Sequence, residues 1–358
     1  ELRKQCLGEK PSSAKGVEMD EYVKSSEKTK LEPGRIGHLP LSIQTMFNID
    51  SSYYQSQTNQ NVLKANTPAI VRFGAPVSEN QSFLAAVGCA YELQIGKISL
   101  NISDLKNALI SNLSVDKFSK LQNGGLIDVF KSGLPQLDMK LWETSDLYKR
   151  ADLSSPDNIT ALQTIQSAYE NYISFIRDEN VIIDYEYCWD LLSLPNPNLF
   201  PTGVNMIILE VPKDDITSKV NVICPSTFNT IASHDPNRPY MVLLKQHDLY
   251  QLIVGYELKR TQIRMTRLFR RGSQSYQKFV QQLVNMGKLL FDYCSPLPSL
   301  PDKYFLEPPV SFSKIMSIDR ASITNSFTDY YGRHIALGMA NDDKTLYVPI
   351  NPTTAEIN

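Results

Sequence analysis

The spacing of apolar residues changes near Pro195, and that change limits the class of fold. Before it, the longest regular pattern runs over Pro156–Arg177, where apolar and aromatic residues recur three and four positions apart. That period predicts an amphipathic helix that begins at Ser155 and Pro156. After Pro195, short runs rich in β-branched and aromatic residues alternate with turn residues, which predicts strands. We therefore expect an α+β protein with a helical N-terminal half.

Five segments of the second half have the composition of strands, and turn residues separate them. They are Val204–Val211, Lys219–Cys224, Tyr240–Lys245, Tyr250–Leu258 and Arg260–Leu268. Their short connections predict an antiparallel β-meander, followed by a helix over Ser273–Tyr293. Three further segments predict a small C-terminal β unit: Ser322–Thr328, Arg333–Met339 and Leu346–Val348.

The first half is expected to contain short helices besides the long one. They are predicted at about Val17–Lys28, Asp104–Leu113 and Val115–Leu121, with a short strand at Ala69–Phe73. Composition divides the chain into four predicted units. These are residues 1–66, an N-terminal extension with a short helical motif; 67–194, a mainly helical domain; 195–294, the antiparallel β-meander plus helix; and 295–358, a Pro-rich linker and the small β unit.

Cysteine usage and hydropathy indicate the kind of environment that the chain suits. Its five cysteines lie far apart and form no CxxC pair. A dispersed, odd-numbered set argues against a disulfide framework and a zinc knuckle, and favours idle thiols in a reducing compartment. No apolar run approaches the length that spans a bilayer, so we expect no membrane partner. Because the chain opens on Glu1, we also expect a fragment or a processed product.

The sequence motifs that mark common enzymes are absent. There is no phosphate-binding GxxxxGK[ST], GxGxxG, GxSxG or HExxH pattern. The pair Asp214–Asp215 follows Pro212 and fits a turn between strands better than a general acid and base, and His234–Asp235 fits a polar loop. We therefore expect a non-enzyme with no catalytic residue, no cofactor and no metal site. A hydrolase or nuclease assembled from scattered acidic and histidine residues is the third hypothesis.

Positive charge is concentrated in one segment of a nearly neutral chain. Against 36 Lys+Arg and 38 Asp+Glu overall, Leu258–Phe291 holds eight basic residues and no acidic one. Six of the eight lie within 13 residues: Lys259, Arg260, Arg264, Arg267, Arg270 and Arg271. Arginine binds phosphate oxygens through paired hydrogen bonds, and Arg270–Arg271 precede a predicted helix N-terminus, which favours anions. We predict that these six residues contact the phosphate backbone of double-stranded DNA. The alternative is an edge strand whose charge prevents aggregation.

Four segments also carry a resemblance to a known family. They are Gly34–Asn48 (GRIGHLPLSIQTMFN), Arg72–Gly74 leading to Asn80–Phe83, Ile207–Glu257 with its LEVPKDDIT and LLKQHDLYQLIVGYE runs, and Leu346–Thr354. These segments resemble the large subunit of the early transcription factor of poxviruses and its relatives in other nucleocytoplasmic large DNA viruses. Members of that family carry a Cys-Cys pair and a further Cys before the first block. Only Cys6 stands there in this chain, so a metal site built on those cysteines would be incomplete.

The resemblance implies a function that needs no catalysis by this chain. It implies a subunit of a viral transcription-initiation factor whose partners are promoter DNA, a helicase-like small subunit and the viral RNA polymerase. It also implies a location in the virion and in the virus factory of the host cytoplasm. The second hypothesis is a structural or assembly protein of a large DNA virus that works through protein–protein interfaces.

Overall fold

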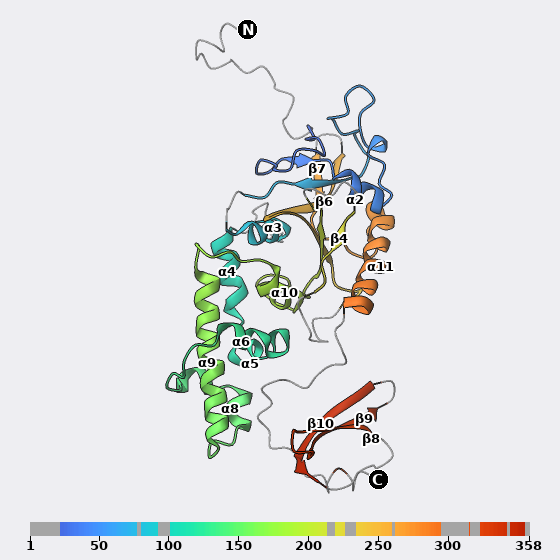
Figure 1. Ribbon diagram of the computed structural model, residues 1–358. Coiled ribbons are helices and arrows are strands. Elements are labelled where there is room, and N and C mark those ends of the chain that lie inside the picture. The colour runs from blue at the N-terminus through green and yellow to red at the C-terminus, as the bar shows by residue number, and fades with distance from the viewer. Residues whose placement is uncertain are drawn as a thin grey trace.

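The computed structural model describes residues 22–76, 80–91, 101–212, 219–225, 234–259, 262–294, 315, 323–341 and 344–354. Over these ranges the protein is α+β, as the sequence predicts. A central sheet has helices on both of its faces, and a separate three-stranded sheet lies near the C-terminus (Figure 1). Within the same ranges, no helix is both long and apolar enough to cross a membrane.

The central sheet combines antiparallel and parallel pairs. Its strands are β1 (Ile36–Gly37), β2 (Ala69–Phe73), β3 (Asn205–Glu210), β4 (Asn221–Val222), β5 (Tyr240–Gln246), β6 (Leu249–Lys259) and β7 (Gln262–Thr266). The order is β1-β2-β6-β5-β3-β4, and β7 also pairs with β6. The strands β5, β6 and β7 form the predicted antiparallel meander. However, β3 and β5 pair in parallel. The intervening strand β4 pairs antiparallel with β3 at the edge of the sheet, so β5, which lies on the other side of β3, runs in the same direction as β3.

Strand β2 joins the first half of the chain to the sheet formed by the second half. It pairs antiparallel with β6, from Ala69 opposite Tyr256 to Phe73 opposite Leu252. Strand β1 pairs with its other edge. The sheet thus draws strands from the first three units that composition predicts, and the boundaries of those units stay a prediction.

The larger core lies between the sheet and a layer of helices. These helices are α3 (Ser82–Ala90), α4 (Ile102–Ser111), α5 (Val115–Phe118), α6 (Gly125–Phe130), α7 (Met139–Trp142), α8 (Asp146–Arg150), α9 (Pro156–Arg177) and α10 (Tyr185–Ser193). The bounds of α9 are those predicted, and its buried face includes Leu162, Ile165 and Tyr172. Every second residue of β6 from Tyr250 to Leu258 belongs to the same core, because alternate side chains of a strand share one face.

The smaller core lies on the opposite face of the sheet, under α2 (Leu41–Met46) and α11 (Gln277–Cys294) (Figure 1). A 3₁₀ turn, η5 (Gln274–Tyr276), leads into α11, so the predicted helix over Ser273–Tyr293 is confirmed. Phe279 of α11 contacts Phe47 beyond α2, with ring centroids 4.8 Å apart. The two other 3₁₀ turns in the described ranges are η2 (Ser51–Tyr53) and η3 (Leu121–Gly124).

The helix predicted at Val17–Lys28 is wrong over the part that the structure describes. Residues 22–28 are extended or turn, and Tyr22 and Lys24 form single β-bridges with Val62 and Gly37. Contacts with the folded sheet thus override the helical preference of a polar, charged segment.

The expectation that the cysteines form no disulfide is also wrong. Cys224, after β4, is bonded to Cys294 at the end of α11, and their Cα atoms lie 5.4 Å apart. The two residues are 70 positions apart, and the spacing of cysteines carries no information about which edge of a sheet meets which helix end. Cys89 and Cys188 are buried free thiols, as expected, and Cys6 lies outside the described residues.

The predicted C-terminal β unit is confirmed as an antiparallel sheet in the order β10-β9-β8. Its strands are β8 (Ile323–Thr328), β9 (His334–Asn341) and β10 (Lys344–Thr353). Ile315, Leu337 and Ile350 form its own small core.

Candidate nucleic-acid interface

The basic stretch runs from the end of β6, through β7, into the turn before α11. Lys259 ends β6, Arg264 lies in β7, and Arg267 follows that strand. Arg270 and Arg271 lie in the turn before η5. Arg260, the sixth predicted residue, lies outside the described residues.

Lys259 and Arg264 lie beside a carboxylate that limits their net charge. Glu257 is opposite Arg264 in the β6–β7 register, and its Oε1 lies 3.4 Å from the Lys259 Nζ. The Glu257 side chain is only 6% exposed. Glu257 stands one position before the stretch that lacks acidic residues, so composition alone does not reveal this compensation. This end of the stretch therefore fits the edge-strand alternative at least as well as DNA contact.

Arg267 is directed toward the helical layer. Its guanidinium carbon lies 5.9 Å from the centroid of the Phe73 ring, and the residue is half-buried. This cation–π contact gives the side chain a structural role on the sheet. We therefore expect Arg267 to contribute less to phosphate binding than the exposed arginines that follow it.

The Arg270–Arg271 turn is exposed and rigidly attached. Directly before it, Phe269 and Tyr240 exchange two backbone hydrogen bonds, of 2.7 and 2.9 Å. The Phe269 side chain is fully buried against Phe279, with ring centroids 4.9 Å apart. The turn is thus fixed to the first residue of β5 and to α11, while both arginine side chains are exposed.

The structure brings further charged residues to this turn from distant parts of the sequence. The His234 Nε2 lies 2.7 Å from the Tyr240 hydroxyl oxygen. The same imidazole lies against α11 so closely that a Cβ at Gly287 would overlap it. We call His234, Arg238, Arg271 and Lys288 the His234 cluster.

The cluster unites cations from three separate segments. Burial lowers the pKa of His234, and the charges of Arg271, Lys288 and Arg238 lower that pKa further, whereas Asp235 raises it. Arg271 and Lys288 are exposed, and the Arg238 side chain is 13% exposed and lies 3.8 Å from an Asp235 oxygen. No local pattern could have joined these residues, since only the Tyr240–Phe269 pair and the position of α11 bring them together.

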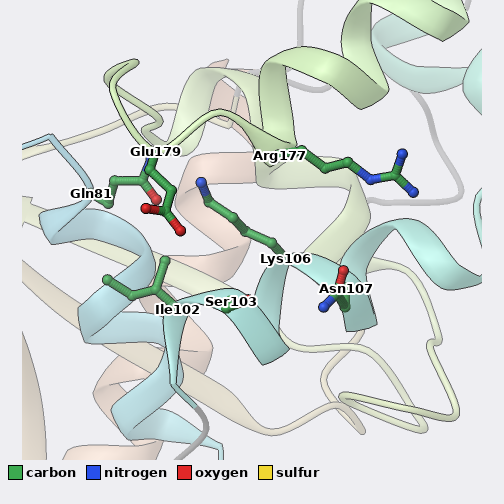
Figure 2. Close-up of a pocket in the computed structure, with 7 residues that line it drawn as sticks. All are labelled: Gln81, Ile102, Ser103, Lys106, Asn107, Arg177 and Glu179. Carbon is green, nitrogen blue, oxygen red and sulfur yellow. The ribbon is translucent and has the colours of Figure 1, made fainter.

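A cavity of about 350 Å³ lies elsewhere, between α4 and the end of α9 (Figure 2). Its lining includes Gln81, Lys106, Arg177 and Glu179. The Lys106 Nζ and the Gln81 Nε2 donate to the Asp178 carbonyl at 2.7 and 2.9 Å. A cation and an amide at the last carbonyls of a helix stabilise that helix end, so these contacts explain the buried lysine. Figure 2 shows Arg177 extending away from Lys106, so the two cations do not converge on one point.

The first two segments of the family resemblance meet at one buried arginine. Arg72 is fully buried, and it donates to the backbone carbonyls of Ser25, Lys28, Thr29 and His38 and to the Gln251 Oε1 at 2.7–3.4 Å. Gly37 lies against its guanidinium, where a Cβ would be only 3.2 Å from a terminal nitrogen. Burial lowers the pKa of Arg72 to about 10. The Gly-His and Arg-Phe-Gly motifs therefore have a structural reason to be present.

The catalytic hypothesis stays untested by the described residues. Asp214 and Asp215 lie outside the described residues, and over those residues no group of three His, Cys, Asp or Glu side chains could hold a metal ion. Searches for similar proteins found no matching family model, curated protein or solved structure.

Proposed function

We propose that this chain is a non-catalytic subunit of a viral transcription-initiation factor that contacts the phosphate backbone of promoter DNA. The observation that supports the proposal best is the exposed Arg270–Arg271 turn. Two backbone hydrogen bonds anchor it, and no carboxylate among the described residues forms an ion pair with either guanidinium. Because the backbone before the turn is already fixed, binding a phosphate orders mainly the two arginine side chains.

The six predicted residues contribute unequally to DNA binding in this proposal. Arg270 and Arg271 are the main contacts, together with the exposed Lys288 of the His234 cluster, while Asp235 reduces the charge of Arg238. Lys259 and Arg264 are flanking contacts whose charge Glu257 reduces. The edge-strand alternative accounts for these flanking residues, but not for arginines that lie in a turn beyond the strand.

The partners follow from the family resemblance. In this proposal the chain pairs with a helicase-like small subunit, which supplies ATP hydrolysis, and both bring the viral RNA polymerase to early promoters. The location would be the virion and the virus factory in the host cytoplasm. The absence of a P-loop motif from this sequence is consistent with that division of labour.

Duplex DNA binding measured against salt concentration tests the proposal. We expect fluorescence anisotropy to show binding at 50 mM salt, with an affinity that falls steeply as salt rises. Replacing both Arg270 and Arg271 with Ala should reduce the slope of log K against log salt by about 2, since each phosphate contact contributes about 0.9. Lys149 and Arg150, an exposed basic pair on α8, provide the matched control. A slope that the Arg270/Arg271 variant leaves unchanged would contradict the proposal.

An apolar groove favours the second candidate, an assembly protein. The groove, of about 420 Å³, lies between the end of α2 and α11, and its lining includes Met46, Phe47, Met286 and Leu289. Leu289 is 54% exposed. An assembly protein should form stable oligomers without DNA in light scattering, and Leu289→Asp should dissociate them. A monomer that binds DNA would argue against this candidate.

A further inference from the structure

The His234 imidazole lies beside the proposed DNA-binding turn, close enough for the charge of Arg271 to act on it. The Tyr240 hydroxyl holds its Nε2 at 2.7 Å, and Gly287 of α11 leaves room for the ring. Burial raises the pKa of Tyr240 to about 12, so this hydroxyl stays protonated near neutral pH. A neutral hydroxyl either donates to the neutral imidazole or accepts from the imidazolium, so the contact persists in both protonation states.

The charged groups around this ring come from every segment that packs against it. Arg238 and Asp235 lie in the loop before β5, Arg271 lies in the turn before α11, and Lys288 lies on α11. Three cations therefore face one carboxylate. Burial lowers the pKa of His234 most, and the three cations lower it further against the opposing effect of Asp235, so the free protein favours the neutral imidazole.

A phosphate group bound beside His234 would offset the excess of positive charge around the imidazole. Arg271 and Lys288 are exposed and offer hydrogen-bond donors to an anion near the imidazole. The negative charge of a bound phosphate would stabilise the imidazolium, whose new Nε2–H donates to the Tyr240 hydroxyl oxygen. Phosphate binding and protonation of the ring should therefore favour each other.

We propose that the His234 cluster binds a phosphate group of DNA and that His234 takes up a proton when it does so. This inference rests on the proposed function and adds its regulation: the chain binds DNA more tightly as pH falls through the neutral range. The gain ends below the pH at which His234 is already protonated in the free protein, because no proton is then taken up.

The test measures duplex DNA affinity at pH 6, 7 and 8 and at fixed ionic strength. The wild-type chain should bind up to about tenfold more tightly at pH 6 than at pH 8, since one unit of pKa difference between bound and free states corresponds to a tenfold change. Calorimetry in two buffers with different ionisation enthalpies should show net proton uptake. His234→Gln should remove both effects, whereas His247→Gln, in the exposed β5–β6 turn, should keep them.

Lys288→Gln provides a second variant for the case that His234→Gln does not fold, because Lys288 is exposed. It removes one of the cations that oppose protonation, so the change of affinity should move to higher pH while binding weakens. DNA binding by the wild-type chain that does not change between pH 6 and pH 8 would overturn the inference and leave the proposed function intact. No DNA binding at pH 6 and 50 mM salt would overturn both.

Discussion

We predict that the Cys224–Cys294 disulfide stabilises the folded protein, by an amount that can be calculated from the length of the loop it closes. It closes a loop of 70 residues, which contains β5, β6, β7 and α11. In the chain-entropy treatment, closing a loop of this length stabilises the folded state by about 4 kcal/mol at 25 °C. Cys224→Ser should therefore lower the midpoint of thermal unfolding by an amount on the order of 10 °C.

Thermal unfolding followed by circular dichroism, with and without a reducing agent, is the assay. Mass spectrometry of the non-reduced protein must first show the peptide that joins Cys224 to Cys294. The reducing agent should destabilise the wild-type chain about as much as the substitution does, and it should leave Cys224→Ser unchanged. A joined peptide together with the same midpoint in both conditions would refute the reasoning, because the bond would then not constrain the unfolded chain.

Three further substitutions test the packing of the sheet. Arg72→Met should lower the free energy of unfolding by more than about 3 kcal/mol in guanidinium titrations, since it leaves several buried acceptors without a donor. Arg150→Ala is the exposed control, and equal losses of stability in the two variants would contradict this role for Arg72. Gly255→Ala should cost about 1–3 kcal/mol in the same titration, because a Cβ there would overlap the Tyr276 ring; an unchanged midpoint would mean that α11 packs differently. The Lys245 Nζ lies 2.7 Å from Glu210, and this hydrogen bond lowers the pKa of that carboxyl below its usual 4.5. Glu210→Gln should thus cost less than about 1 kcal/mol in urea at pH 7 and progressively less as pH falls below 4.5, and a cost that persists in acid would contradict the ion pair.

Individual helices and strands of this fold could be predicted from the sequence, because the spacing of apolar residues within each segment determines them. The apolar spacing of Pro156–Arg177 gave the bounds of α9, and Ala69–Phe73 gave those of β2. What could not be predicted is how distant segments pair. Nothing in Ala69–Phe73 indicates that it lies beside a strand about 180 positions later, and nothing in β3 indicates that its neighbour β5 is parallel.

The same limit explains what the sequence missed at the candidate site. The sequence indicated the Arg270–Arg271 turn, because six of 13 consecutive residues there are basic. It could not show that Glu257 lies across from Arg264, nor that Arg238 and His234 reach the same turn. Both facts depend on strand register and helix position, which pairing across the sheet determines.

The bonding of Arg72 has a consequence for the order in which the chain can fold during its synthesis. One of its acceptors, Gln251, follows it by 179 positions. At translation rates of about 5–20 residues per second, β2 waits roughly 10 to 40 s after its synthesis before β6 can pair with it. During that interval the Gln251 acceptor and the neighbouring strand are missing, so residues 22–73 can complete their final arrangement only after β6 has been made. A ribosome-bound chain that ends before β6 should accordingly be cut readily by protease near Arg72.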